Sequence, residues 1–163
     1  MSLTLHPYDS PVGELRLVAT DDALVAVLWP DDAEGRVRFS EEPVEGSHEV
    51  LHRTASQLDE YFAGERQSFD LPLEPNGTEF QRSVWWSLAE IPFGETSTYG
   101  AQAEVIGRPR AVRAVGTANG KNPLSIVLPC HRIVGADGGL AGFAGGLETK
   151  RWLLDHEASV AAQ

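Results

Sequence analysis

The 163-residue sequence contains a single cysteine, Cys130. One thiol cannot form a disulfide within the chain, and it cannot supply a zinc site that needs several cysteines. The sequence also lacks an apolar run long enough to span a bilayer, and it does not start with a basic segment followed by an apolar one. We therefore expect a cytoplasmic protein with no membrane partner, built as one large domain or as two small ones sharing a core.

Positive charge is scarce, because the formal net charge is −11. The imbalance lies in residues 1–75, which carry 16 acidic and 5 basic side chains, whereas residues 76–163 carry 8 of each. Residues 105–136 contain no acidic residue and five basic ones: Arg108, Arg110, Arg113, Lys121 and Arg132. Such a patch either binds nucleic acid or is an ordinary solvated surface, so charge alone does not decide the function.

The first half has the patterns of a small α/β domain. Alternating apolar residues predict a β-hairpin over residues 13–29 that turns at Asp21 and Asp22, and a short strand is expected at Val37–Phe39. Ser47 is expected to cap a helix that ends at Gly64. The Pro-containing stretch 68–78 predicts an extended linker, and we place the domain boundary there, between residues 1–75 and 76–163.

The second half is predicted to be helical. Thr78 is expected to cap a helix with Val84 and Leu88 on its apolar face. A short helix over Tyr99–Ile106, a turn at Gly107 and a second helix opened by Pro109 follow. This outline fits a helix-turn-helix or an ordinary helical hairpin.

The surface of the second helix favours the DNA-binding alternative. The pattern places alanines on one face, arginines and Thr117 on the adjacent face, and Val112 and Val115 toward the core; the first two faces comprise Ala111, Ala114, Ala118, Arg110, Arg113 and Thr117. Small side chains beside cations suit close approach to a large anionic partner, such as a DNA groove.

Cys130 is followed directly by His131 at the end of the apolar stretch "LSIVLP", which is expected to be extended. A neighbouring histidine is a common means of producing a thiolate nucleophile, although a lone cysteine can also be buried and inert. Glu157 lies on the apolar side of the last helix and is a candidate to orient His131; a salt bridge at the helix end is the alternative.

Two further motifs leave alternatives open. Six glycines between residues 135 and 146 form either a flexible linker or a pocket wall where backbone N–H groups approach a ligand. The letters "HEVLH", His48 to His52, match a zinc-protease pattern with Glu49 as the base, but no third ligand follows at a known spacing. We therefore predict no metal site.

Residues Thr78 to Glu157 resemble the methylated-DNA–protein-cysteine methyltransferases, also called alkylguanine-DNA alkyltransferases, through "RAVG", "NP", "PCHR" and the glycine loop in this order. The resemblance implies a ribonuclease-H-like α/β N-terminal domain and a helical, winged-helix-like C-terminal domain. It implies that the protein, without a cofactor and as a monomer, binds double-stranded DNA containing an alkylated guanine. The base leaves the stack, and its alkyl group moves irreversibly from the 6-oxygen to the cysteine, once per molecule.

The resemblance also assigns site residues. Cys130 is the alkyl acceptor, His131 its water-mediated base, Glu157 the residue that orients His131, and Asn122 a brace for the turn before the cysteine. The residues expected to contact DNA or the damaged base are Arg113, Tyr99, Arg110, Ala114, Ile133, Phe143 and Ala144. Among these, Arg113 is expected to fill the stack in place of the flipped base, and Tyr99 to help rotate the nucleotide. The backbone near Ile133 is expected to read the guanine edge.

The glycine loop departs from the family pattern, since Phe143 stands where a tyrosine is usual and Ala144 where a serine is usual. The multi-cysteine zinc site of some relatives is excluded. A DNA-binding module that recognises lesions without transferring a group, and a Cys-His hydrolase that turns over repeatedly, are the rival functions.

Overall fold

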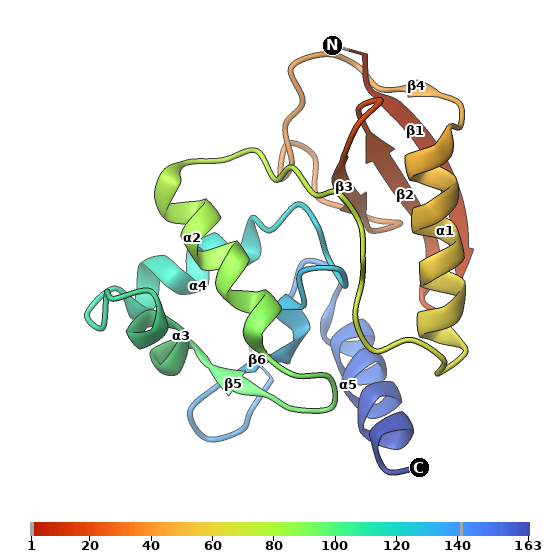
Figure 1. Ribbon diagram of the computed structural model, residues 1–163. Coiled ribbons are helices and arrows are strands. Elements are labelled where there is room, and N and C mark those ends of the chain that lie inside the picture. Colours follow the sequence, from red (N-terminus) through yellow and green to blue (C-terminus); the bar gives the residue numbers. More distant parts are fainter. Residues whose placement is uncertain (1, 141) are drawn as a thin grey trace.

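The computed structural model describes residues 2–140 and 142–163, and it shows a sheet domain followed by a helical domain (Figure 1). The N-terminal sheet has the order β3-β2-β1-β4, with β4 parallel to β1 and the other neighbours antiparallel. Its strands are β1 (Thr4–Ser10), β2 (Gly13–Ala19), β3 (Leu24–Leu28) and β4 (Val44–Glu45). Helix α1 (Glu49–Phe62) packs against this sheet. The expected mixed α/β fold is confirmed.

The predicted hairpin forms as β2 and β3, because its apolar residues are buried and its acidic pair is exposed at the turn. Strand β1 was not predicted, since Pro7 and Asp9 interrupt its apolar pattern. The strand expected at Val37–Phe39 is wrong. Those side chains pack on the outer cluster of the sheet from an irregular segment, so their alternation reflects packing rather than strand pairing.

Helix α1 begins one residue later than expected. His48 is its N-cap and makes no side-chain cap hydrogen bond, so the predicted cap at Ser47 is wrong. The end at Gly64 is confirmed, with φ of +78° in the left-handed region that glycine tolerates. The buried face of the helix includes Leu51, Leu58 and Tyr61, whereas Phe62 is only partly buried.

Helix α2 (Glu79–Ser87) opens the helical domain as predicted, with a capping box between Thr78 and Gln81. The 3-10 turn η1 (Leu88–Glu90) continues it. Val84 and Leu88 are fully buried, which confirms the predicted apolar face.

Helices α3 (Tyr99–Val105) and α4 (Val112–Gly120) form the predicted helical pair. Pro109 does not open α4: the Ala111 N–H donates to the Arg108 carbonyl and closes a turn, so the helix starts three residues later. The prediction that Val112 faces the core is also wrong, because it is 40% exposed. Val115 is buried as predicted. Ala118 is buried as well, so the alanine face is only partly available to a partner.

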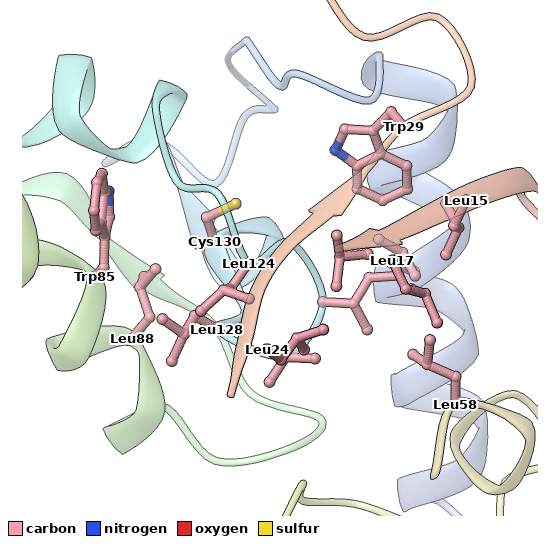
Figure 2. Packing of buried hydrophobic residues seen from close by; sticks show 14 of the residues in the cluster. Leu15, Leu17, Leu24, Trp29, Leu58, Trp85, Leu88, Leu124, Leu128 and Cys130 are labelled. Atoms are coloured by element: carbon pink, nitrogen blue, oxygen red, sulfur yellow. The ribbon is translucent and has the colours of Figure 1, made fainter. Parts of the chain in front are cut away.

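The two halves share one core, in which side chains of β2 and β3 pack with those of α2 and of residues 124–133 (Figure 2). Two segments that follow later in the chain, at Pro72 and at Pro123, accept backbone hydrogen bonds from the edge of β3. The Leu24 N–H donates to the Pro72 carbonyl at 2.8 Å, and the Val27 N–H donates to the Pro123 carbonyl at 2.8 Å. The N-terminal sheet therefore holds both the linker and the chain that leads to Cys130.

The last helix, α5 (Leu147–Ala161), lies next to the C-terminal end of α1 (Figure 1). Contacts from Tyr61 to Glu157 and to His156 join the two helices, although 96 and 95 residues separate these pairs. Within residues 2–140 and 142–163, no helix combines the length and the apolar character needed to cross a membrane.

Candidate active site

We call residues 122–134 the acceptor segment. The prediction that its stretch "LSIVLP", which precedes Cys130, is extended is wrong. Ile126 has a φ of +72°, and the Leu128 N–H donates to the Leu124 carbonyl at 2.8 Å, so the chain turns. Cys130 then starts a 3-10 turn, η2 (Cys130–Arg132). Strand β6 (Ile133–Val134) follows and pairs in parallel with β5 (Ser97–Thr98). Cys130 and His131 are therefore presented by a helical turn.

Asn122 closes the turn ahead of Cys130. Its side chain is fully buried, its Nδ2 donates to the Leu128 carbonyl at 2.8 Å, and its Oδ1 accepts from the Leu124 N–H at 3.0 Å. The Asn122 carbonyl accepts in turn from Arg36 at 2.9 Å, and Arg36 is paired with Asp32 at 2.6 Å. The Asn122 side chain and the ion pair between Arg36 and Asp32 of the N-terminal domain thus fix the start of the acceptor segment.

Cys130 reaches a cavity of about 270 Å³, whose lining comprises Tyr99, Gly116, Asn119, Gly120, Cys130, Gly142, Phe143 and Ala144. Cys130 is 8% exposed, and Figure 2 shows its sulfur directed away from Leu88 and Leu128 at the edge of the core. Burial raises the pKa of the Cys130 thiol, and the hydrogen bond with Asn122 and the nearby charges of Arg36 and Lys150 offset this only partly. The resting sulfur is therefore a thiol that needs a base.

His131 is fully buried, with its Nε2 2.7 Å from Glu157 Oε2. Because a carboxylate can only accept, Nε2 carries the proton and Nδ1 is left with a lone pair. In residues 2–140 and 142–163, Nδ1 has no hydrogen-bond partner. Burial lowers the pKa of His131 and outweighs the opposite effect of Glu157, so the ring is neutral and able to accept a proton at neutral pH.

Glu157 is 1% exposed and accepts hydrogen bonds from three side chains. Besides His131, Arg132 donates from Nε to Oε1 at 2.8 Å and from Nη2 to Oε2 at 3.1 Å, and Tyr61 donates to Oε2 at 2.6 Å. The carboxylate therefore contacts the histidine and also forms a salt bridge with Arg132. Arg132 is consequently buried, so its assignment to the exposed basic patch is wrong.

The site predicts that acid destabilises the fold. Burial alone would raise the pKa of Glu157, but the bonds and charges of His131 and Arg132 lower it from 4.5 to about 2. Because the pKa of Glu157 is lower in the folded than in the unfolded protein, its ionisation contributes about 3 kcal/mol of stability at pH values above its unfolded-state pKa. This contribution is lost as the pH falls toward 2. Buried His131 stays neutral in the folded protein, whereas the unfolded chain takes up a proton on this side chain below its ordinary pKa of 6.5. The free energy of unfolding therefore also falls as the pH drops below that value. Denaturant unfolding at several pH values checks this; the Glu157→Gln variant should show a shallower decline between about pH 4.5 and 2, and an equal decline would contradict it.

The glycine loop, residues 135–146, forms a wall of the cavity through Gly142, Phe143 and Ala144. This finding favours the pocket-wall alternative. The loop is packed on the N-terminal domain: the Phe143 and Trp29 rings meet edge-to-face with centroids 5.4 Å apart. A Cβ on Gly145 would lie 2.8 Å from two carbons of the Trp29 indole, so only glycine fits this approach.

Of the residues predicted to contact DNA, Tyr99, Phe143 and Ala144 line this cavity, whereas Arg110, Arg113, Ala114 and Ile133 are not among its lining residues. Tyr99, at the start of α3, is half-buried and lines the cavity, and burial followed by the Cys130 charge raises its pKa. Arg110, Arg113 and Ala114 are exposed on α4 and the turn before it. Ile133 is fully buried, its N–H donates to the Cys130 carbonyl, and it is not among the residues that line the cavity.

The "HEVLH" motif does not form a metal-binding arrangement in the described part of the chain. His48 precedes the first helical residue and His52 lies within α1. In residues 2–140 and 142–163, no group of three histidine, cysteine or acidic side chains could hold a metal ion.

Five side chains around the site were missed by the sequence analysis: Arg36, Tyr61, Arg132, Lys150 and Trp29. Lys150 is buried near the Phe143 ring, with its Nζ 5.9 Å from the ring centroid. A buried position for Arg132 could have been suspected from its place beside His131 in "PCHR". Tyr61 and Trp29 carry no sequence signal, because each meets the site only through tertiary packing.

Comparisons with known proteins cover both halves of the chain. Residues 4–75 match the family model described as 6-O-methylguanine DNA methyltransferase, ribonuclease-like domain, and residues 79–159 match the DNA-binding domain of the same name. A methylated-DNA–protein-cysteine methyltransferase of Methanosarcina acetivorans is 46% identical over 152 residues, 93% of this chain and 96% of the relative. The protein of that name from Mycolicibacterium paratuberculosis is 47% identical over 148 residues, 90% of this chain and 87% of its own.

Solved structures agree with these matches. The O6-methylguanine methyltransferase of Mycobacterium tuberculosis superposes with a TM-score of 0.87 at 40% identity, covering 96% of this chain and 93% of that chain. The crystal structure of Mycobacterium tuberculosis OGT in complex with DNA superposes with a TM-score of 0.85 at 41% identity, covering 96% and 94%.

Proposed function

This chain belongs to the methylated-DNA–protein-cysteine methyltransferase family, and on that premise we propose that Cys130 is its alkyl acceptor. The protein repairs DNA by moving an alkyl group from the 6-oxygen of guanine to its own cysteine. The transfer is irreversible, so each molecule acts once. The observation that carries the assignment of Cys130 is its place at a cavity, next to a buried neutral histidine whose Nδ1 has no hydrogen-bond partner among the described residues.

The chemistry requires a proton to leave the thiol as the sulfur attacks. In our proposal a bridging water passes the Cys130 proton to Nδ1 of His131, and Glu157 stabilises the imidazolium that forms. The sulfur forms a bond to the alkyl carbon, and the bond between that carbon and the guanine oxygen breaks with its electron pair on the oxygen. The base then takes up one proton from water, the His131 imidazolium returns its proton to water, and guanine is restored. This transfer between two covalent partners needs no cofactor.

We further propose that the DNA partner is a duplex containing alkylated guanine, bound through α3 and α4. Arg110, Arg113 and Ala114 would face the duplex, since they are exposed beside the cavity. Arg113 would occupy the space of the flipped base, and Tyr99 would help rotate its nucleotide into the cavity.

Inside the cavity, the backbone around Cys130 and Ile133 would read the guanine edge, and the N–H of Ala144 would approach its oxygen. Asn122 would keep the acceptor segment in place. We propose that the protein carries out the transfer as a monomer, with an N-terminal domain of residues 1–75 and an acceptor domain of residues 76–163.

Transfer stoichiometry tests the proposal. Excess duplex carrying radiolabelled 6-O-methylguanine is incubated with the protein, and label bound to protein is counted over time. We expect a plateau at one methyl group per chain, and no label on a Cys130→Ala variant. Release of label with repeated turnover would favour a hydrolase, and binding without transfer would favour a lesion-recognition module; either result overturns the assignment.

The Phe143→Tyr substitution is predicted to speed the transfer by roughly 10- to 100-fold, because a phenol at this position would donate a hydrogen bond to the leaving guanine. Phe143 lines the cavity at its glycine-loop wall, and its ring packs on Trp29. Single-turnover rates on methylated duplex measure the effect. Phe39→Tyr, on a half-buried phenylalanine in the outer cluster of the N-terminal sheet, serves as the control. An unchanged rate for Phe143→Tyr would show that the missing donor does not limit transfer.

A further inference from the structure

Tyr61 connects the N-terminal domain to the proposed catalytic carboxylate. It lies in α1, is fully buried, and its hydroxyl donates to Oε2 of Glu157 at 2.6 Å. The same oxygen lies 2.7 Å from Nε2 of His131. We propose that Tyr61 is a positioning residue of the transfer reaction, through which the N-terminal domain sets the strength of the His131 base. The inference rests on the proposed function.

Tyr61 positions the Glu157 carboxylate in a way that Arg132 does not. Arg132 also binds the carboxylate, but it sits on the same 3-10 turn as His131 and moves with it. Tyr61 comes from a separate helix, 96 residues away from Glu157 in the sequence. It therefore fixes Oε2 relative to the body of the protein, independently of the acceptor segment.

The phenol ring itself has little freedom. Aromatic rings surround it, with centroid distances of 5.6 Å to Phe69, 6.1 Å to Phe93 and 5.3 Å to His156. His156 also contacts the main-chain oxygen of Tyr61 at 2.9 Å. Because packing already holds the ring, the hydrogen bond to Glu157 loses little side-chain entropy on forming.

The hydroxyl acts as a permanent donor. Burial, followed by the charge and hydrogen bond of Glu157, raises the pKa of Tyr61 well above its ordinary value. A donor on Oε2 draws negative charge away from the oxygen that faces His131. The carboxylate then stabilises a protonated imidazole less strongly, so His131 stays neutral and available as a base to a lower pH.

Removal of this donor should raise the pKa of His131, with the other surroundings of the ring unchanged. The titratable and charged groups around His131 are Glu157 and Lys150 of α5, Arg132 and Cys130 of η2, and Tyr61 of α1. His156 meets Tyr61 through the main chain, a contact that Tyr61→Phe retains.

Tyr8 offers a matched control. Its hydroxyl donates to Oδ1 of Asp59 at 2.6 Å, and this bond joins β1 to α1 within the same domain. Tyr8→Phe therefore removes the same kind of bond at the same length, but away from His131. A general loss of stability would affect both Tyr8→Phe and Tyr61→Phe, whereas a change in the basicity of His131 would appear only in Tyr61→Phe.

The experiment is the pH dependence of single-turnover transfer for the wild type, Tyr61→Phe and Tyr8→Phe. We expect the acidic limb of the Tyr61→Phe profile to move up by about one pH unit, which makes transfer about tenfold slower below the limb and restores it at high pH. Tyr8→Phe should keep the wild-type limb. A fluorinated tyrosine at position 61 keeps the ring and hydroxyl but donates more strongly, so its limb should move to lower pH.

Coincident limbs for all four proteins would overturn the inference. So would a Tyr61→Phe rate that is lower by one factor at every pH, because that result describes packing alone. Both outcomes leave the alkyl transfer of the wild type intact. Failure of the proposed function would look different, since the wild type itself would then acquire no methyl group.

Discussion

Replacing Glu157 by glutamine is expected to slow alkyl transfer by about 100-fold and to lower the free energy of unfolding by about 3–5 kcal/mol. The amide has almost the same shape but carries no charge. It cannot stabilise a protonated His131, and its NH₂ group would face a side chain that also donates. Arg132 would remain buried without a counter-charge, which accounts for the loss of stability.

Two further variants separate these effects. Glu148 is an exposed carboxylate in the first turn of the same helix, so Glu148→Gln should change neither rate nor stability. The double variant Glu157→Gln with Arg132→Met removes the unpaired charge, and it should recover part of the stability while transfer stays slow. Single-turnover kinetics and denaturant unfolding measure both quantities. Transfer by Glu157→Gln at the wild-type rate would refute the proposed relay.

The Arg113→Ala variant is expected to transfer about 100-fold more slowly from a methylated duplex. Arg113 is exposed on α4, so its removal leaves the core intact. In the proposed complex its side chain replaces the flipped guanine in the stack. Extrusion of a base costs a few kcal/mol, and about 3 kcal/mol of lost compensation corresponds to the predicted rate.

A substrate that needs no extrusion isolates this effect. A free base such as 6-O-benzylguanine needs no extrusion from a duplex, so Arg113→Ala should react with it at the wild-type rate. Arg108→Ala, an exposed arginine in the turn before α4, is the control for charge alone and should weaken duplex binding without the large loss of rate. Equal losses on free base and duplex would place the defect in the cavity, and no loss on the duplex would contradict the assignment of Arg113.

Sequence patterns predicted the elements that local interactions determine. The hairpin of β2 and β3 and the helix N-cap at Thr78 need only neighbouring residues, and both formed as expected. The start of α4 was placed too early because Pro109 is favourable at a first helical position, yet a turn closed by Ala111 takes that place. Val112 is the first residue of α4 and lies exposed at the helix end, whereas Val115, one turn later, is buried.

The site was predictable to a similar extent. Adjacency in the chain put His131 beside Cys130, and an apolar stripe indicated that Glu157 is buried, as the structure shows. Their arrangement around a cavity came from the family resemblance. Tyr61 and Arg36 could not be found from either source, because hydrogen bonds across 96 and 86 residues leave no local pattern.

The central test is to locate the transferred group. The protein is incubated with duplex DNA containing 6-O-methylguanine, digested and analysed by mass spectrometry of its fragments. We predict that the fragment containing Cys130 gains the mass of one methylene, as expected when methyl replaces the thiol hydrogen, and that every other fragment is unchanged. Methyl on a different residue, or restored guanine with an unmodified protein, would contradict the account.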